Sequence, residues 1–114
     1  MILKRGDIIL VPFPFTDLTS SKVRPAVIVS TDPQTDDIII AFISSVVSNS
    51  LANTDFLLTT ANPDFTKTGL KKDSVFKMGK LLTISSALIL RRLGRITPIL
   101  EKELNSLLKK ALNL

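Results

Sequence analysis

The sequence predicts a mainly β protein with a single α-helix at its C-terminal end. Runs of aliphatic and β-branched residues fill the first two thirds of the chain, and clusters of Gly, Pro, Asp and Ser separate them. Beyond residue 97 the apolar residues change to helical spacing. With 114 residues the chain is long enough for one core, so we expect residues 1–114 to form a single domain.

The run from Lys22 to Ser30 is the centre of this prediction. Arg24 and Pro25 lead into an apolar, mostly β-branched segment that is typical of a strand buried on both faces. Proline suits the first residue of a strand and pushes the residue before it toward extended geometry. This places Arg24 at the mouth of a rigid strand, where a guanidinium can bind an anion. The alternative is a charge that caps a hydrophobic strand or joins a surface ion pair, and spacing alone favours that alternative.

Several further segments have strand character. They are residues 8–11, ended by Pro12; 37–43, apolar on both faces; 56–58; 74–78, which alternates up to a bulge or close approach at Gly79; 81–90, ambiguous between strand and short helix; and 91–96, a solvated edge strand protected by its arginines. Adjacent strands that are apolar on both faces need cover on both sides. One side is expected to be a barrel core, and the C-terminal helix or a second subunit covers the other.

The start of the helix is marked by Thr97 and Pro98, a hydroxyl N-cap followed by proline at the first helical position. Apolar residues then recur at 100, 104, 107, 108 and 111, while the opposite face carries Glu101, Lys102, Asn105, Lys109 and Lys110. We interpret this helix as scaffold.

Composition excludes several classes of chemistry. The chain contains no Cys, so it has no disulfide or thiolate metal site, and no His, which removes Ser-His and Cys-His mechanisms. Nucleotide-binding glycine loops and the zinc motif HExxH are absent as well. We therefore expect no metal and no cofactor. Residues 1–7 lack a signal sequence, and the longest apolar run, 38–47, is about half a membrane span, so we expect a soluble, cytoplasmic protein without membrane contact.

The remaining polar groups suit a phosphate ligand. The formal charge is +5, which favours a polyanionic partner. Ser44 and Ser45 follow a buried strand and can donate to a phosphate, although an ordinary hydroxyl turn is the more frequent explanation. Phe15, in the proline-interrupted loop after residue 11, can stack on a base or anchor the loop, and anchoring is the commoner role.

Such a set of groups suits a reaction in which the substrate supplies its own nucleophile. In RNA the 2′-OH attacks the neighbouring phosphate when the two are held in line, and the protein positions the strand and neutralises developing charge. An arginine fork matches phosphate oxygens well. The same residues also fit a phosphate-binding module without chemistry.

A family resemblance distinguishes between these alternatives. The segments that carry it are Gly6-Asp7-Ile8, Arg24 to Ser30, Ile43-Ser44-Ser45, Asp73-Ser74-Val75 and Leu82-Thr83-Ile84. In order and spacing, across essentially the whole chain, they resemble the MazF/PemK toxins. The resemblance implies an SH3-like β-barrel with a C-terminal helix, usually a homodimer. It also implies a metal-independent endoribonuclease that cuts single-stranded RNA to a 2′,3′-cyclic phosphate and is inhibited by an antitoxin protein.

The resemblance also assigns residues. The essential arginine of the family falls on Arg24 and its hydroxyl residue on Ser44. These are the predicted catalytic residues. The predicted RNA-binding residues are Lys22, Ser45, Lys77, Phe15 and Asp17.

The chain departs from the family where many members carry an acid, an amide and a later arginine, because it has Gly79, Lys80 and Leu82 there. Asp17 is then a candidate general base by proximity in sequence. The alternative function is a catalytically weakened RNA- or protein-binding module of the same fold.

Overall fold

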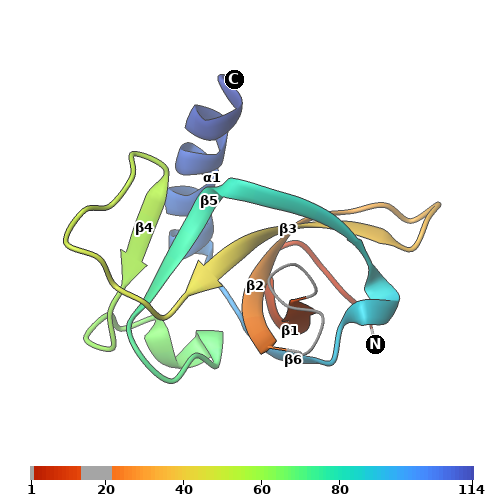
Figure 1. Ribbon diagram of the computed structural model, residues 1–114, viewed down its shortest axis with the longest axis horizontal. Coiled ribbons are helices and arrows are strands. Elements are labelled where there is room, and N and C mark those ends of the chain that lie inside the picture. Colours follow the sequence, from red (N-terminus) through yellow and green to blue (C-terminus); the bar gives the residue numbers. More distant parts are fainter. Residues whose placement is uncertain (1, 14–21) are drawn as a thin grey trace.

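The structure is a computed structural model that describes residues 2–13 and 22–114. Figure 1 shows an antiparallel sheet that curls into a partly open barrel, with one helix against its outer side. The elements are β1 (Asp7–Phe13), β2 (Lys22–Thr31), β3 (Asp37–Ser44), β4 (Asp55–Leu58), η1 (Phe65–Thr68), β5 (Ser74–Ser85), η2 (Ser86–Leu88), β6 (Arg91–Arg95) and α1 (Pro98–Leu112). The strand order is β4-β5-β3-β2-β1-β6. The predicted mainly β fold with a C-terminal helix is confirmed.

Each face of the sheet has its own hydrophobic cluster. The helix-side cluster consists of Ile8, Val27, Ala41, Ile43, Leu58, Phe65, Phe76, Met78, Ile96, Leu100 and Leu104. The inner cluster consists of Ile9, Val11, Ala26, Ile28, Ile38 and Ile40, inside the curl of the sheet. Two clusters explain why β2 and β3 are apolar at consecutive positions. The helix covers one face, as predicted.

Helix α1 begins where the sequence predicts. The Thr97 hydroxyl accepts the Leu100 N–H at 3.3 Å, and Pro98 occupies the first turn. Leu100 and Leu104 are buried in the helix-side cluster. No helix within the described residues, α1 included, has the length and apolar character needed to cross a membrane.

Two prolines lie inside strands and not at their ends, which corrects the sequence prediction. β1 continues through Pro12, which pairs with Val23, and Pro25 is the fourth residue of β2. Pairing of β1 with β6 ends at Leu10, and pairing of β2 with β3 begins only at Ala26. Both prolines therefore lie where each strand has a single neighbour, so the missing N–H removes no second ladder.

Strand β5 resolves the ambiguous segment that follows Gly79. It runs unbroken to Ser85, and the single-turn η2 then leads to β6. Leu81 packs against the helix-side cluster and Leu82 against the inner cluster. Both leucines are half-buried and contribute to the core of their own chain.

The charges of β6 have a structural role beyond protecting an edge. Asp7 is fully buried, and its carboxylate lies 3.1 Å from Arg95 and 3.6 Å from Arg92. The backbone N–H of Lys4 donates to the same carboxylate at 2.8 Å. The prediction of an edge strand is confirmed, but two of its arginines bind a buried acid.

Candidate functional site

Arg24 lies on β2 two residues before Ala26, the first residue of that strand that pairs with β3. It stands opposite Val11, and its side chain is exposed. Because side chains alternate along a strand, Arg24 shares a face with Ala26, a member of the inner cluster. The guanidinium therefore projects from the rim of the barrel on the inner face.

Ser44 is the last residue of β3 and is half-buried. Its Oγ accepts the Val46 N–H at 3.1 Å, so the ordinary hydroxyl turn considered above is present. That bond occupies an acceptor position of the hydroxyl, whose proton can be donated to a ligand. The turn therefore fixes the direction of the hydroxyl without preventing it from binding an anion.

Lys77 belongs to the same face through its pairing. It lies opposite Phe42 of β3 on one side and Asp55 of β4 on the other. Phe42 packs against the inner cluster and pairs in turn with Ala26. Directly opposed residues share a face of a sheet, so the row from Ala26 to Lys77 faces the same way as Arg24.

These side chains line one open hollow of about 300 Å³. The described residues that line it are Arg24, Phe42, Ile43, Ser44, Val46, Lys77 and Lys80. Three of the predicted site residues thus come together from three strands. Lys22 is exposed at the start of β2 and Ser45 is exposed after β3, and neither lines the hollow. Phe15 and Asp17 lie outside the described residues.

The sequence alone does not identify Phe42 or Lys80 as site residues. Phe42 is part of a continuous apolar run, so nothing in the sequence distinguishes it from a core residue. Lys80 lies three positions after Lys77, and in a regular strand residues three apart point to opposite faces. The signal that could have identified Lys80 is Gly79, because a bulge beside a glycine changes that alternation.

The charge around the hollow is positive. Among the described residues that line it there is no carboxylate. Asp55 lies beside Lys77 in the next strand, but its Oδ2 accepts the Ala52 N–H at 3.0 Å. Within the described part of the chain the only ion pairs join Asp7 to Arg92 and Arg95, so no carboxylate described here neutralises the cations of the hollow.

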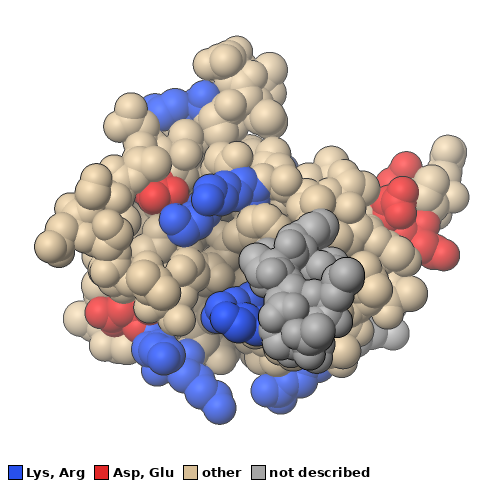
Figure 2. Space-filling view, in the orientation of Figure 1, with Lys and Arg blue, Asp and Glu red and all other residues tan. Residues whose placement is uncertain are grey.

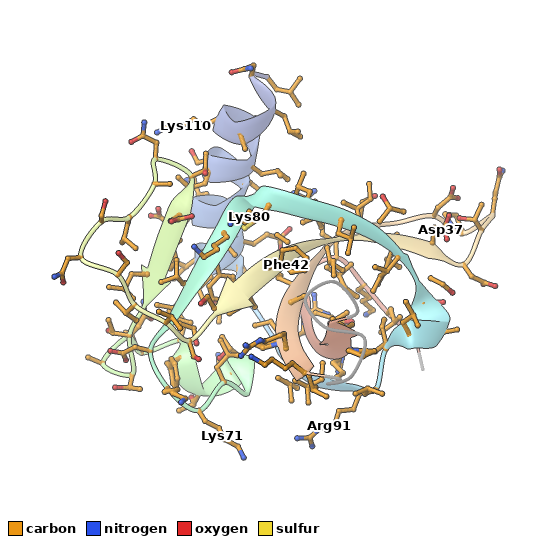
Figure 3. The ribbon with its side chains drawn as sticks, in the orientation of Figure 1. Asp37, Phe42, Lys71, Lys80, Arg91 and Lys110 are labelled. Atoms are coloured by element: carbon orange, nitrogen blue, oxygen red, sulfur yellow. The ribbon has the colours of Figure 1, made fainter. Side chains whose placement is uncertain are left out.

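The distribution of charge over the surface supports this choice of site. Figure 2 shows lysine and arginine side chains over the middle and lower part of one face, while the most prominent acidic group lies at the right-hand tip. Figure 3 labels Asp37 at that tip, the β2–β3 hairpin. A larger hollow of about 460 Å³ lies there, but Asp32 and Asp37 line it, so it would repel a polyanion.

Comparison with solved structures shows that this fold is shared with toxins. One similar structure is an "endoribonuclease in complex with its cognate antitoxin" from a mycobacterial species, with a TM-score of 0.74 and 17% identity over 99% of this chain and 97% of the other. Another is the Mycobacterium tuberculosis toxin MazF-mt6, with a TM-score of 0.72 and 21% identity over 95% of this chain and 97% of the other.

Sequence comparison identifies the family. No curated protein matches the chain. A family profile described as "PemK-like, MazF-like toxin of type II toxin-antitoxin system" matches residues 4–112. That match contains every strand of the sheet and the whole of α1. The chain therefore belongs to the PemK-like, MazF-like toxins of type II toxin–antitoxin systems.

Proposed function

We propose that this protein is an endoribonuclease that cuts single-stranded RNA, messenger RNA included, without a metal ion. The observation that carries the proposal is the convergence of Arg24, Ser44 and Lys77 on one hollow that no described carboxylate lines. Membership of a toxin family supports it. So do similar folds in proteins named as endoribonucleases.

The proposed reaction is an internal transfer within the RNA. The ribose 2′-oxygen bonds to the adjacent phosphorus, the 5′-oxygen of the next nucleotide leaves and takes up a proton, and the products end in a 2′,3′-cyclic phosphate and a 5′-hydroxyl. Because the nucleophile belongs to the substrate, the protein contributes alignment and charge stabilisation. The reaction requires no metal, since a guanidinium can neutralise the charge that develops on the phosphate oxygens.

Each site residue has a part in this scheme. Arg24 stabilises the pentavalent phosphate and Ser44 donates a hydrogen bond to it. The residues assigned to strand binding are Lys22, Ser45, Lys77, Phe15 and Asp17. Of these, Asp17 is also the candidate base that accepts the 2′-hydroxyl proton.

The family also points to partners. We propose that a small cognate antitoxin protein binds the chain and holds it inactive, as expected for a toxin of a type II system. One structure of similar fold is a complex with its antitoxin. We further propose that the protein acts as a homodimer in the cytoplasm, where messenger RNA is its substrate.

Cleavage of a fluorogenic single-stranded RNA in EDTA tests the proposal. We expect turnover in EDTA, products with cyclic phosphate ends by mass spectrometry, and a loss of about 10²–10³ in rate for Arg24→Ala. Arg91→Ala is the matched control, because Arg91 is an exposed strand arginine that does not line the hollow. No turnover by the wild-type protein, or turnover that survives Arg24→Ala, would reject the assignment.

A second candidate function is binding without cleavage. It is favoured by one observation, the glycine at position 79 where many members of the family carry an acid, together with a hollow that no described carboxylate lines. In that case the wild-type protein binds RNA saturably and yields no product, and Arg24→Ala weakens binding. The same assay, run beside a binding titration, distinguishes the two functions.

A further inference from the structure

The β5 strand contains a three-residue bulge beside the hollow. Ala41 of β3 pairs with Leu81, whereas the next residue, Phe42, pairs with Lys77. Residues 78–80 therefore have no partner in β3. Bulges of this kind bend a strand and redirect a side chain, and they are frequent next to functional sites.

Contacts with Thr54, before β4, hold the bulge in place. The Met78 N–H donates to the Thr54 carbonyl oxygen at 3.2 Å, next to the pairing of Asp55 with Lys77 between β4 and β5. A Cβ on Gly79 would lie 2.8 Å from the Thr54 hydroxyl oxygen, so only glycine fits without a shift. The bulge is thus a packed structural feature with a defined shape.

The bulge brings Lys80 to the same hollow as Lys77. Both lysines line it together with Arg24, although the regular alternation of a strand would separate Lys77 from Lys80. Figure 3 shows Lys80 and Phe42 on the neighbouring strands β5 and β3. Neither lysine forms an ion pair with a described carboxylate. Two lysines of β5 therefore line the hollow together with Phe42 of β3.

The chemistry of lysine indicates what these two side chains recognise. An ammonium group is a compact point charge that pairs well with phosphate, and it lacks the fixed two-point geometry with which an amide or a guanidinium reads a base edge. Two such groups that form no ion pair with a described carboxylate favour a polyanionic backbone over a neutral base. We propose that Lys80 binds a backbone phosphate of the RNA, so that the part of the hollow lined by β5 is insensitive to base sequence. The proposal rests on the proposed RNA substrate.

Salt-dependent binding of 2′-O-methyl RNA tests this directly, because such RNA lacks the nucleophile and stays intact. For single strands, the slope of log affinity against log salt falls by about 0.7 for each phosphate that the protein no longer neutralises. We expect Lys80→Ala and Lys80→Gln both to lower the slope by about this amount, and equally on RNAs of different sequence. Lys110→Ala is the control, because Lys110 is exposed on α1 and does not line the hollow.

The outcomes separate this inference from the proposed function. An unchanged slope for Lys80→Ala, a slope that Lys80→Gln retains, or an effect that depends on the base sequence overturns the phosphate assignment, even if the wild-type protein cleaves RNA. If the wild-type protein binds 2′-O-methyl RNA with the expected slopes but cleaves no RNA, the phosphate assignment holds and the nuclease proposal fails. If 2′-O-methyl RNA does not bind, the phosphate assignment is wrong.

Discussion

The carboxylate of Asp7, the first residue of β1, accepts a hydrogen bond at 3.1 Å from the guanidinium of Arg95, the last residue of β6. The two residues are 88 positions apart in the chain. The acid is fully buried, whereas the side chain of Arg95 is 41% exposed. Gly6 and Asp7 belong to a family-like motif, and the structure gives the acid a structural role. Asp7 binds Arg92 and Arg95 and so holds β1 against β6, and it is not among the residues that line the hollow with Arg24.

Replacing Asp7 with alanine is expected to destabilise the fold. The change removes the anionic partner of Arg95 and leaves the Lys4 N–H without its carboxylate. We expect the free energy of unfolding to fall by about 3 kcal/mol, measured by urea denaturation. Asp36→Ala, at an exposed position on the β2–β3 hairpin, is the control and should stay within about 0.5 kcal/mol of wild type. Equal effects of the two changes would contradict a structural role for Asp7.

Ser44 and Ser48 form a matched pair for testing the proposed role of the Ser44 hydroxyl. Each accepts a backbone N–H two residues later at 3.1 Å, but only Ser44 lines the hollow. We expect Ser44→Ala to slow cleavage by about 10² and Ser44→Thr to retain most of it, because threonine keeps the donor. Ser48→Ala should cleave at the wild-type rate. If both alanine variants lose cleavage equally, the turn matters and the hydroxyl donor does not.

The close approach of Gly79 to Thr54 predicts that substitutions at these two positions have coupled effects on stability. Gly79→Ala places a methyl group against the Thr54 hydroxyl. Because the Thr54 side chain can rotate away, the free energy of unfolding should fall by only about 1 kcal/mol, and RNA binding should weaken because Lys80 is displaced. Adding Thr54→Ala removes the obstructing oxygen and should restore both properties in part. A double-mutant cycle with no coupling energy would show that Gly79 and Thr54 do not shape the bulge.

Gly69 is expected to be the glycine least tolerant of replacement. Its φ is +74°, and a Cβ there would lie 2.1 Å from the Leu93 carbonyl oxygen, where η1 presses on β6. Gly69→Ala should lower the free energy of unfolding by at least about 2 kcal/mol. Thr66→Ala, an exposed change in the same short helix, serves as the control in thermal unfolding. Similar melting temperatures for the two variants would refute the close approach.

Local patterns predict those parts of the fold that depend on neighbours in sequence. Thr97 and Pro98 locate the helix start because a cap and a preset φ act within a single turn. The aliphatic runs of β2 and β3 predict burial on both faces, and the two clusters confirm it. The places of Pro12 and Pro25 could not be predicted, because they depend on where β3 and β6 cease to pair with β2 and β1.

The sequence likewise predicts some residues of the candidate site and not others. Arg24 and Ser44 stand out from sequence because each borders an apolar run, and the structure places both on one hollow. Lys80 could not be placed, because its direction depends on a register shift between β3 and β5, and such a shift is a property of two strands together. A glycine beside a charged residue in an alternating strand is the local sign of such a shift.

Pro12 and Pro25, which lie outside the pairing of β1 with β6 and of β2 with β3, have a consequence for self-association. Where a strand lacks a neighbour on one side, its unpaired backbone groups can pair with an extended chain from another molecule. Pro12 and Pro25 each remove a backbone donor from the paired strands β1 and β2. The part of β2 that carries Arg24 therefore offers one backbone donor fewer to an extended chain from another molecule, which disfavours edge-to-edge pairing there.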